Sequence, residues 1–289
     1  MSGTDLRIRN MTRTEVDELV EWAAVEGWNP GLHDADIFWR TDPEAFLAAE
    51  LNNQLIGGGA ITCYGEYGFM GFFIIKPAFR GQGLGNVLWH ARRDRLLARL
   101  PATGTIGMDG VFNMQPYYAS GGFVFAHRDL RFRLDHAWSL SVSHDKTHNL
   151  VPISAIPFEQ LAEYDRSCFP AGRDRFLTAW IHQPDALALA CKNGDELSGY
   201  GVVRKCREGY KIGPLFADDA NIAEALFLHL IEFAEGPVFL DIPENNQAAM
   251  VLARRYPMQE VFGCARMYLG AAPSLMHDRI FGVTTFELG

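Results

Sequence analysis

The sequence predicts an α/β protein whose mixed sheet carries helices on both of its sides. Strand-like and helix-like segments follow one another in the order β-α-α-β-β-β-α-β-α-β over the first 135 residues. A second set of such segments begins near residue 150, and a glycine-rich turn near residue 80 joins a continuous apolar strand to an amphipathic helix. Two tandem α/β units are therefore expected.

Hydrophobic periodicity places the elements of the first unit. In the helix expected at 84–100, Leu88 and Leu96 face the core, and Arg92 is assigned with its neighbouring arginines to the solvated face. A helix following Thr12 or Thr14 begins at a capping residue. The other strands are expected at 6–9, 69–75, 105–111 and 123–134, with a strand pair over 51–64 that turns near Asn52-Asn53, and the other helices at 34–50 and 114–120.

The second unit repeats markers of the first. The strand-turn pattern at Gly57 recurs at Gly199, and Asp109 ends a strand as Asp241 does. These markers are 52 residues apart in the first unit and 42 in the second, and the shortfall lies where the first unit has its glycine loop. We interpret the pattern as a divergent duplication, with chance similarity between two α/β units as the alternative.

The expected domains are residues 1–138 and 150–289, separated by a polar linker at 135–150. Within the second domain, helices are expected at 158–165, 173–181, 221–234 and 246–255, and strands at 187–192, 197–204, 210–216 and 238–241.

Composition excludes several classes of function. The formal charge of −9 argues against a nucleic-acid partner, because phosphate binding needs clustered Lys and Arg. The chain has no apolar run of about 20 residues and no apolar N-terminal signal, so we expect no membrane span and a cytoplasmic location. Five cysteines without a CxxC pair are expected as free thiols. No metal site is expected, since His144 and His148 have no third ligand.

The glycine loop predicts an anion-binding site at the start of a helix. Unpaired amides at a helix N-terminus bind phosphate, and glycines allow a ligand to approach the backbone. Neither common phosphate loop fits, because Gly85 is followed by Asn86 rather than by Lys-Ser, and a GxGxxG pattern counted from Gly81 fails at its sixth position. The pattern RxxGxG fits from Arg80 to Gly85. An ordinary glycine-rich turn is the alternative.

The segment from Ile75 to Gly85, Ile-Lys-Pro-Ala-Phe-Arg-Gly-Gln-Gly-Leu-Gly, resembles the acetyl-CoA-binding motif of the GNAT superfamily of N-acetyltransferases. The resemblance covers about residues 5–135 and implies the GNAT fold. In that family the loop amides hold the coenzyme A pyrophosphate, and the preceding strand pairs with the pantetheine arm. The resemblance implies cofactor contacts at Phe73, Ile74, Ile75, Arg80, Gly81, Gln82, Gly83, Leu84, Gly85, Asn86 and Asn113.

A second motif, from Asn113 through Tyr118 to Gly122-Phe123, resembles the later motif of the same family. There a tyrosine protonates the departing coenzyme A thiolate, and Tyr118 occupies that position. A phenol with a pKa near 10 is a suitable proton donor to a thiolate. Simple packing is the alternative role for Tyr118. The neighbouring Tyr117 is expected to point to another face.

Candidates for the catalytic base and for the acceptor pocket come from other segments of the first unit. Residues 69–75 contain no carboxylate, although some family members carry a base on this strand. Asp109 is the preferred candidate for orienting or deprotonating the amine, with Glu66 and Asp34 as runners-up, and capping or deprotonation through water as alternatives. Trp28 and Asn29 fall in the connection that borders the acceptor pocket in this superfamily.

The resemblance implies direct transfer of the acetyl group of acetyl-CoA to a primary amine of a small molecule or peptide in a ternary complex. The second unit resembles the smaller C-terminal domain of some bacterial two-part acetyltransferases, but it lacks RxxGxG. Covering the acceptor side is the role we favour for it, against plain support or contact within a homodimer. A non-catalytic acyl-CoA sensor and a transferase for longer acyl groups are the competing hypotheses.

We predict that titration with acetyl-CoA gives one site per chain, because only the first unit has the phosphate loop. Gly83→Asp should abolish this binding while leaving the fold intact, since the new carboxylate faces the pyrophosphate. Calorimetry and circular dichroism measure the two effects. Two sites per chain, or unchanged affinity in the variant, would contradict the assignment.

Overall fold

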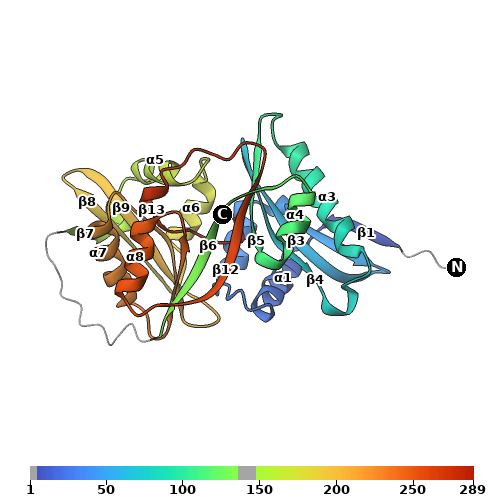
Figure 1. Cartoon of the computed structure of the whole chain (residues 1–289), viewed down its shortest axis with the longest axis horizontal. Coiled ribbons are helices and arrows are strands. Elements are labelled where there is room, and N and C mark those ends of the chain that lie inside the picture. Colours follow the sequence, from blue (N-terminus) through green and yellow to red (C-terminus); the bar gives the residue numbers. More distant parts are fainter. Residues whose placement is uncertain (1–4, 136–147) are drawn as a thin grey trace.

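The computed structural model describes residues 5–135 and 148–289, which we call the first half and the second half (Figure 1). The predicted linker falls largely between them, and most of it, with His144, lies outside the described residues. The first half contains β1 (Leu6–Asn10), α1 (Arg13–Val25), α2 (Asp34–Thr41), β2 (Phe46–Leu51), β3 (Gln54–Tyr64), β4 (Tyr67–Ile75), α3 (Leu84–Arg99), β5 (Thr105–Val111), α4 (Gln115–Ser120) and β6 (Val124–Leu134).

The second half has the same sequence of elements, plus a short final strand. It contains β7 (Asn149–Pro152), α5 (Phe158–Cys168), α6 (Asp174–Ile181), β8 (Ala186–Asn193), β9 (Glu196–Lys205), β10 (Tyr210–Ala217), α7 (Ala220–Ile231), β11 (Val238–Pro243), α8 (Gln247–Arg255), β12 (Gln259–Leu269) and β13 (Ile280–Gly282). The predicted order of elements is confirmed for the first half, and the duplication is confirmed because the same order recurs in the second half. Three strands of the second half, β7, β12 and β13, are not among those predicted.

One predicted boundary is wrong. The helix expected over 34–50 ends at Thr41, because Asp42 has an extended backbone and precedes Pro43, which disfavours a helical conformation in the residue before it. A short 3₁₀ turn then leads into β2. At the start of α1, Thr12 rather than Thr14 is the capping residue, and it forms a reciprocal capping box with Glu15.

Each half gives one strand to the other. In the described residues thirteen strands form one sheet in the order β1-β2-β3-β4-β5-β12-β6-β11-β10-β9-β8-β7, and β13 pairs with β10. β12 of the second half therefore separates β5 from β6, and β6 lies between β12 and β11. Figure 1 shows the green β6 and the red β12 running through the middle of the molecule. We propose that residues 1–138 and 150–289 are two copies of one repeat that fold together.

The exchanged strands also exchange core side chains. Leu130, Phe132 and Leu134 of β6 are buried in the apolar core beneath α7 and α8 of the second half. In return, Ala265 and Met267 of β12 belong to the core beneath α3 and α4 of the first half. Burial of this kind stabilises each half only when the other is present.

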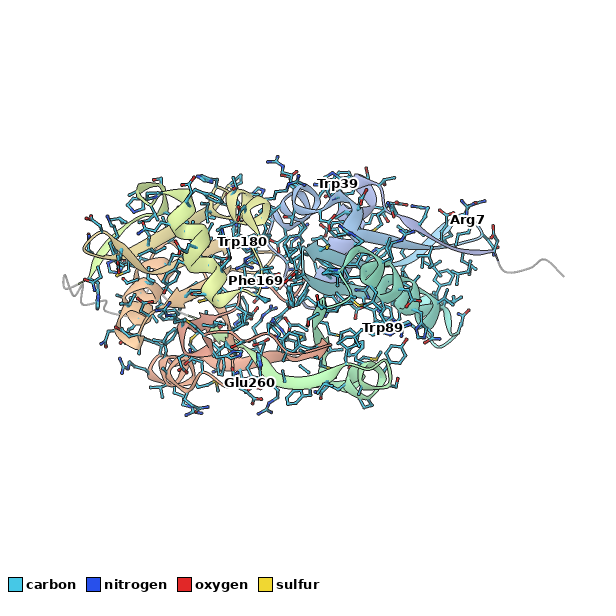
Figure 2. All side chains as sticks on the ribbon, turned by 90° about the horizontal axis from the view of Figure 1, so that it is seen from above. Arg7, Trp39, Trp89, Phe169, Trp180 and Glu260 are labelled. Atoms are coloured by element: carbon cyan, nitrogen blue, oxygen red, sulfur yellow. The ribbon has the colours of Figure 1, made fainter. Side chains whose placement is uncertain are left out.

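Aromatic side chains close the junction between the halves. Phe169 contacts the rings of Tyr64 and Tyr67 at centroid distances of 5.2 and 5.6 Å. Trp180 stacks on Phe38 at 6.3 Å. Figure 2 shows Phe169 and Trp180 near the middle of the molecule, where the two halves meet. No helix within the described ranges is both long and apolar enough to cross a bilayer.

We predict that residues 1–138 expressed alone do not form a stable domain, because β5 and β6 lose their shared neighbour β12 and β6 exposes its apolar face. Co-expression with residues 149–289 should restore a soluble 1:1 complex. Size-exclusion chromatography and thermal denaturation measure this. A monomeric 1–138 fragment with a cooperative melting transition would contradict the strand exchange.

Candidate functional site

A cavity opens where β4 and β5 separate. The two strands pair in parallel only between residues 67–69 and 105–107. Beyond this point β4 continues to Ile75 and β5 to Val111 without pairing with each other. A cavity of about 720 Å³ is lined by both of these unpaired strand sections. Backbone groups of both strands are thus available to a ligand that enters as an added strand.

A bulge in β4 shapes this cavity. The register of β4 with β3 shifts within residues 71–74, and Phe72 has a φ angle of 52°. Gly71 permits a close approach of the C-terminal segment, because a Cβ at this position would lie 1.8 Å from the carbonyl oxygen of Glu287. The bulge therefore meets a segment of the second half at the edge of the cavity.

Arg92 of α3 is bonded to the backbone of the β4 bulge. Its assignment to the solvated face is therefore wrong. Arg92 is fully buried on the same stripe of α3 as Leu88 and Leu96, and this i, i+4 spacing could have placed it inside. Its Nη2 donates to the carbonyl oxygens of Ala60 (2.8 Å) and Gly71 (2.5 Å). Nε and Nη1 have no partner among the described residues, and burial lowers the pKa of Arg92 to about 10.

The glycine loop leaves the start of α3 open. Gly81 and Gly83 have φ angles of 74° and 78°, a region that favours glycine. Gly83 is the N-cap of α3, so no side chain of the capping residue bonds to the amides of the first turn. The space beside Gly81 and Gly83 is open, since a Cβ built at these positions has no atom outside the adjoining residues within 4 Å. Gly65, in the turn between β3 and β4, has a similar φ angle of 76° and equally open space, so Gly65→Asp is a matched control for Gly83→Asp.

Most of the expected cofactor residues lie at one cavity. Gln82 and Leu84 do not line it, since the Gln82 side chain bonds to the carbonyl oxygen of Ala78 (3.1 Å) and Leu84 packs into the core beneath α3. The amide of Asn86 donates to the Gly83 carbonyl oxygen (3.1 Å) and is not free. The residues that do line the cavity are Phe73, Ile74, Ile75, Arg80, Gly81, Gly83, Gly85, Asn86 and Asn113.

Arg80 ties the loop to its neighbours. Its Nε donates to the carbonyl oxygen of Ile75 at 2.7 Å, and its Nη2 pairs with the carboxylate of Glu26 at the end of α1. These bonds hold the loop next to the end of β4, where Gly81, Gly83 and Gly85 line the cavity.

Tyr118 lies on α4 with its ring flat against β5. The ring is buried beside Trp89, at a centroid distance of 5.0 Å, and a Cβ at Gly110 would lie only 2.4 Å from it. Burial raises the pKa of Tyr118 to about 12, and the Arg92 guanidinium opposes this rise. Tyr117 also lines the cavity, contrary to expectation, and its hydroxyl donates to the Asn86 side chain (3.0 Å).

Asp109 is engaged in an ion pair between the halves. Arg266 of β12 donates to both of its carboxylate oxygens, at 2.6 and 2.7 Å. Burial raises the pKa of Asp109, the Asp129 carboxylate adds to the rise, and Arg266 opposes it. The same pair recurs in the second half, where Arg131 of β6 binds Asp241 at 2.6 and 2.8 Å. Because the copy has no glycine loop, we propose that Asp109 locks the exchanged strand and is not the base.

The first connection contributes Trp28 but not Asn29. Trp28 lines the cavity, whereas both groups of the Asn29 amide bond to the backbone of Glu208, at 2.9 and 2.8 Å. The two runners-up for the base are also placed elsewhere. Asp34 is fully buried and paired with Arg204 at 3.1 Å, and Glu66 lies exposed in the turn before β4.

The sequence favours a covering role for the second half, but it does not identify the residues that line the cavity from that half. Phe262 and Cys264 of β12 line it, as do Phe286 and Glu287 of the C-terminal segment. No local pattern identifies these residues, because they reach the site only through the exchanged strand and the chain that follows it. Within the described ranges, no group of three or more His, Cys, Asp or Glu side chains is arranged to hold a metal ion.

Comparisons with known proteins agree with this architecture. The family model described as "Acetyltransferase (GNAT) family" matches residues 13–119, and "Acetyltransferase (GNAT) domain" matches residues 161–282. The chain is 25% identical over 272 residues to the holothin acyltransferase of Pseudoalteromonas sp. (strain SANK 73390), covering 93% of this chain and 90% of that protein. It is 23% identical over 202 residues to an uncharacterized N-acetyltransferase of Bacillus subtilis, covering 67% and 68%.

Solved structures share the fold. A putative acetyltransferase from Pyrococcus horikoshii superimposes with a TM-score of 0.84 at 24% identity, covering 100% of this chain and 98% of the other. A tandem GNAT protein from the clavulanic acid biosynthesis pathway superimposes with a TM-score of 0.65 at 14% identity, covering 93% and 100%. The tandem arrangement is thus present in another protein.

We predict that Asp109→Asn and Asp241→Asn both destabilise the protein, because each leaves a buried arginine short of its carboxylate. Loss of one partner of a buried pair costs about 3–5 kcal/mol. Asp109→Asn should lower the free energy of unfolding by less than Asp241→Asn does, since Arg266 still forms an ion pair with Asp129 at 3.5 Å. Thermal denaturation measures the effect. Turnover per folded molecule should stay within about tenfold of wild type in both variants, and a loss of about 10²–10⁴-fold in Asp109→Asn alone would make Asp109 the base.

Proposed function

Since this chain belongs to the GNAT superfamily of acetyltransferases, we propose that it transfers the acetyl group of acetyl-CoA directly to a primary amine in a ternary complex. The observation that carries the proposal is that one cavity combines an open helix N-terminus, two unpaired strand sections and the buried phenol of Tyr118. Acyl transfer from a thioester needs each of these parts: an anion site, a channel for an extended arm and a proton donor.

The glycine loop is the proposed site for the pyrophosphate of acetyl-CoA. The uncapped start of α3 presents amides and the positive end of the helix dipole to an anion. The pantetheine arm would then run along residues 73–75 of β4, whose outward backbone groups β5 does not use. This path leads from the loop to the β4 bulge and to Tyr118.

Tyr118 is the proposed acid. Attack of a neutral amine on the thioester carbonyl forms the C–N bond, and cleavage of the C–S bond releases a thiolate that needs a proton. A pKa of about 12 keeps the Tyr118 hydroxyl protonated at neutral pH, and among the described residues this hydroxyl has no hydrogen-bond partner. It is thus available as a donor to the sulfur.

The second half is proposed to bind no acetyl-CoA. Its helix α7 corresponds to α3, but Asp219 caps it and accepts hydrogen bonds from the amides of Asn221 (2.8 Å) and Ile222 (3.0 Å). A carboxylate thus occupies the place that a phosphate would take. This cap and the missing glycine loop both support one site per chain.

A panel of substrates tests both the acyl group and the acceptor. One relative is named an acyltransferase rather than an acetyltransferase, so the test includes acyl donors other than acetyl-CoA. A panel of acyl-CoA donors and primary amines, followed by detection of the released thiol, distinguishes an acetyltransferase from a longer-chain transferase and from a non-catalytic acyl-CoA sensor.

We predict that Tyr118→Phe keeps acetyl-CoA binding but lowers turnover by about 10²–10⁴-fold, because only the donated proton is lost. Tyr256→Phe is the matched control, since the Tyr256 hydroxyl bonds to Glu224 in the second half at 2.5 Å and lies away from the cavity. Steady-state thiol release and calorimetry measure both effects. Near-normal turnover in Tyr118→Phe would reduce Tyr118 to a packing residue.

A further inference from the structure

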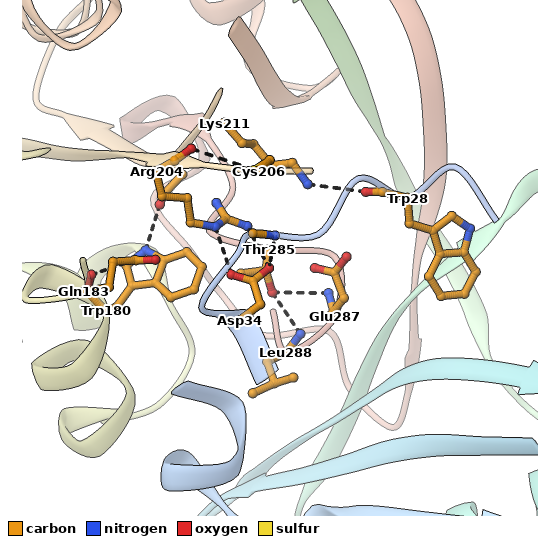
Figure 3. Close-up of polar contacts among 12 residues, drawn as sticks. Trp28, Asp34, Trp180, Gln183, Arg204, Cys206, Lys211, Thr285, Glu287 and Leu288 are labelled. Carbon is orange, nitrogen blue, oxygen red and sulfur yellow. Dashed lines mark hydrogen bonds and ion pairs between the residues drawn. The ribbon is translucent and has the colours of Figure 1, made fainter. Parts of the chain in front are cut away.

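The C-terminal segment carries a buried carboxylate to the cavity. After β13 the chain crosses the bulge of β4, and the Glu287 backbone contacts Gly71 there. Glu287 is 2% exposed and lines the cavity. Thr285 fixes this position, because its hydroxyl accepts hydrogen bonds from the amides of Glu287 (3.2 Å) and Leu288 (2.9 Å). Figure 3 shows these bonds and the Glu287 side chain between Asp34 and Trp28.

The Glu287 carboxylate has no protein partner among the described residues. Its Oε2 is buried without a hydrogen bond, and no dashed line reaches the carboxylate in Figure 3. The neighbouring arginines do not pair with it, since Arg131 binds Asp241 and Arg204 binds Asp34. A buried acceptor without a partner is costly, so it indicates a role with a ligand.

Aromatic side chains surround this part of the cavity. Trp28 comes from the first connection, Phe262 from β12 and Phe286 from the residue before Glu287. The rings of Phe262 and Phe286 lie 6.2 Å apart. Apolar walls beside a single unpaired carboxylate suit a ligand that is apolar along its body and cationic at its end.

We propose that Glu287 binds the ammonium group of an apolar primary amine and takes its proton as the catalytic base. This inference rests on the proposed function. It supplies the base that is missing from β4 and assigns it to the C-terminal segment of the second half.

The proton balance requires two transfers from nitrogen. The ammonium gives its first proton to Glu287, which passes it to water, and the neutral amine attacks the thioester carbonyl. The nitrogen becomes acidic once the C–N bond has formed, and its second proton replaces the one that Tyr118 gives to the departing sulfur. The products are the amide, the free thiol of coenzyme A and one proton in solution.

The charges around Glu287 suit this task. Burial raises the pKa of Glu287 and Asp34 of α2 adds to the rise, while Lys211 of β10, Arg131 of β6 and Arg204 of β9 oppose it. A carboxyl with a raised pKa is a stronger base. It is protonated below that pKa, so turnover of a basic amine should rise with pH as Glu287 ionises.

A purely structural role predicts a different behaviour. Glu287 could serve only as the counter-charge of Lys211, whose ammonium donates, within the described ranges, one long hydrogen bond of 3.5 Å to the Trp28 carbonyl oxygen. Loss of such a counter-charge lowers stability and impairs all acceptors alike. Loss of a base impairs only those acceptors that arrive protonated.

The test compares two amines in three proteins. A panel of primary amines first identifies the best apolar acceptor of the wild-type full chain. Its β,β-difluorinated analogue then serves as the matched amine, and the two are compared at about pH 8.5, where the analogue is largely neutral and the parent amine is still protonated. The variants are Glu287→Gln, which keeps the shape of the side chain, and Thr285→Ala, which loosens the same segment. Thiol release at several pH values, acetyl-CoA affinity and melting temperature are measured for each.

We expect Glu287→Gln to lose about 10²–10⁴-fold in kcat on the basic amine and at most about tenfold on the fluorinated one, with acetyl-CoA affinity unchanged. Its pH profile should lose the rise that is due to Glu287. Thr285→Ala should impair both amines equally.

Three results would overturn the proposal. Equal losses on both amines in Glu287→Gln, or none, would remove Glu287 as the base while the transferase function stands. Turnover only of polar amines would refute the apolar acceptor. Absence of thiol release by the wild type with every amine would remove the proposed function and this inference together.

Discussion

Two buried arginines hold the exchanged strands in place. Arg266 of β12 forms an ion pair with Asp109 of β5, and Arg131 of β6 forms one with Asp241 of β11. Each half thus pairs an arginine with an aspartate of the other half. Both aspartates end up opposite their arginine in the strand register. A buried pair of this kind fixes a register more surely than it adds stability, because desolvation offsets much of its attraction. We infer that these two pairs set the central register of the sheet.

The same exchange builds the site from both halves. With β12 beside β5, Phe262 and Cys264 border the cavity, and the chain that follows reaches the bulge of β4. The second half completes the sheet and lines part of the cavity, and we propose that this is why it is retained without a phosphate loop. Under this proposal neither half would form the complete site alone.

Local sequence predicted the local parts of the site. Three glycines after a buried strand predict a helix that starts without a side-chain cap, as α3 does. Tyr118, which the resemblance to the later family motif singles out, lines the same cavity, and its role stays a prediction. Arg92 was assigned wrongly, although its spacing from two inward leucines places it in the core. The contacts of Asp109 and Glu287 could not be predicted, because the residues that they contact, on β12 and β4, are more than 150 residues away in the sequence. Duplication was visible in the sequence, but strand exchange between the copies leaves no local pattern.

A structure of the protein with coenzyme A and the acceptor amine tests the central claim most directly, namely that one cavity built by both halves brings the reactants together. The account predicts the pyrophosphate at the amides following Arg80 and the sulfur within about 3.5 Å of the Tyr118 hydroxyl. It also predicts the amine nitrogen within hydrogen-bond reach of Glu287, about 2.6–3.2 Å. Coenzyme A at the start of α7, or an acceptor bound away from the C-terminal segment, would contradict it.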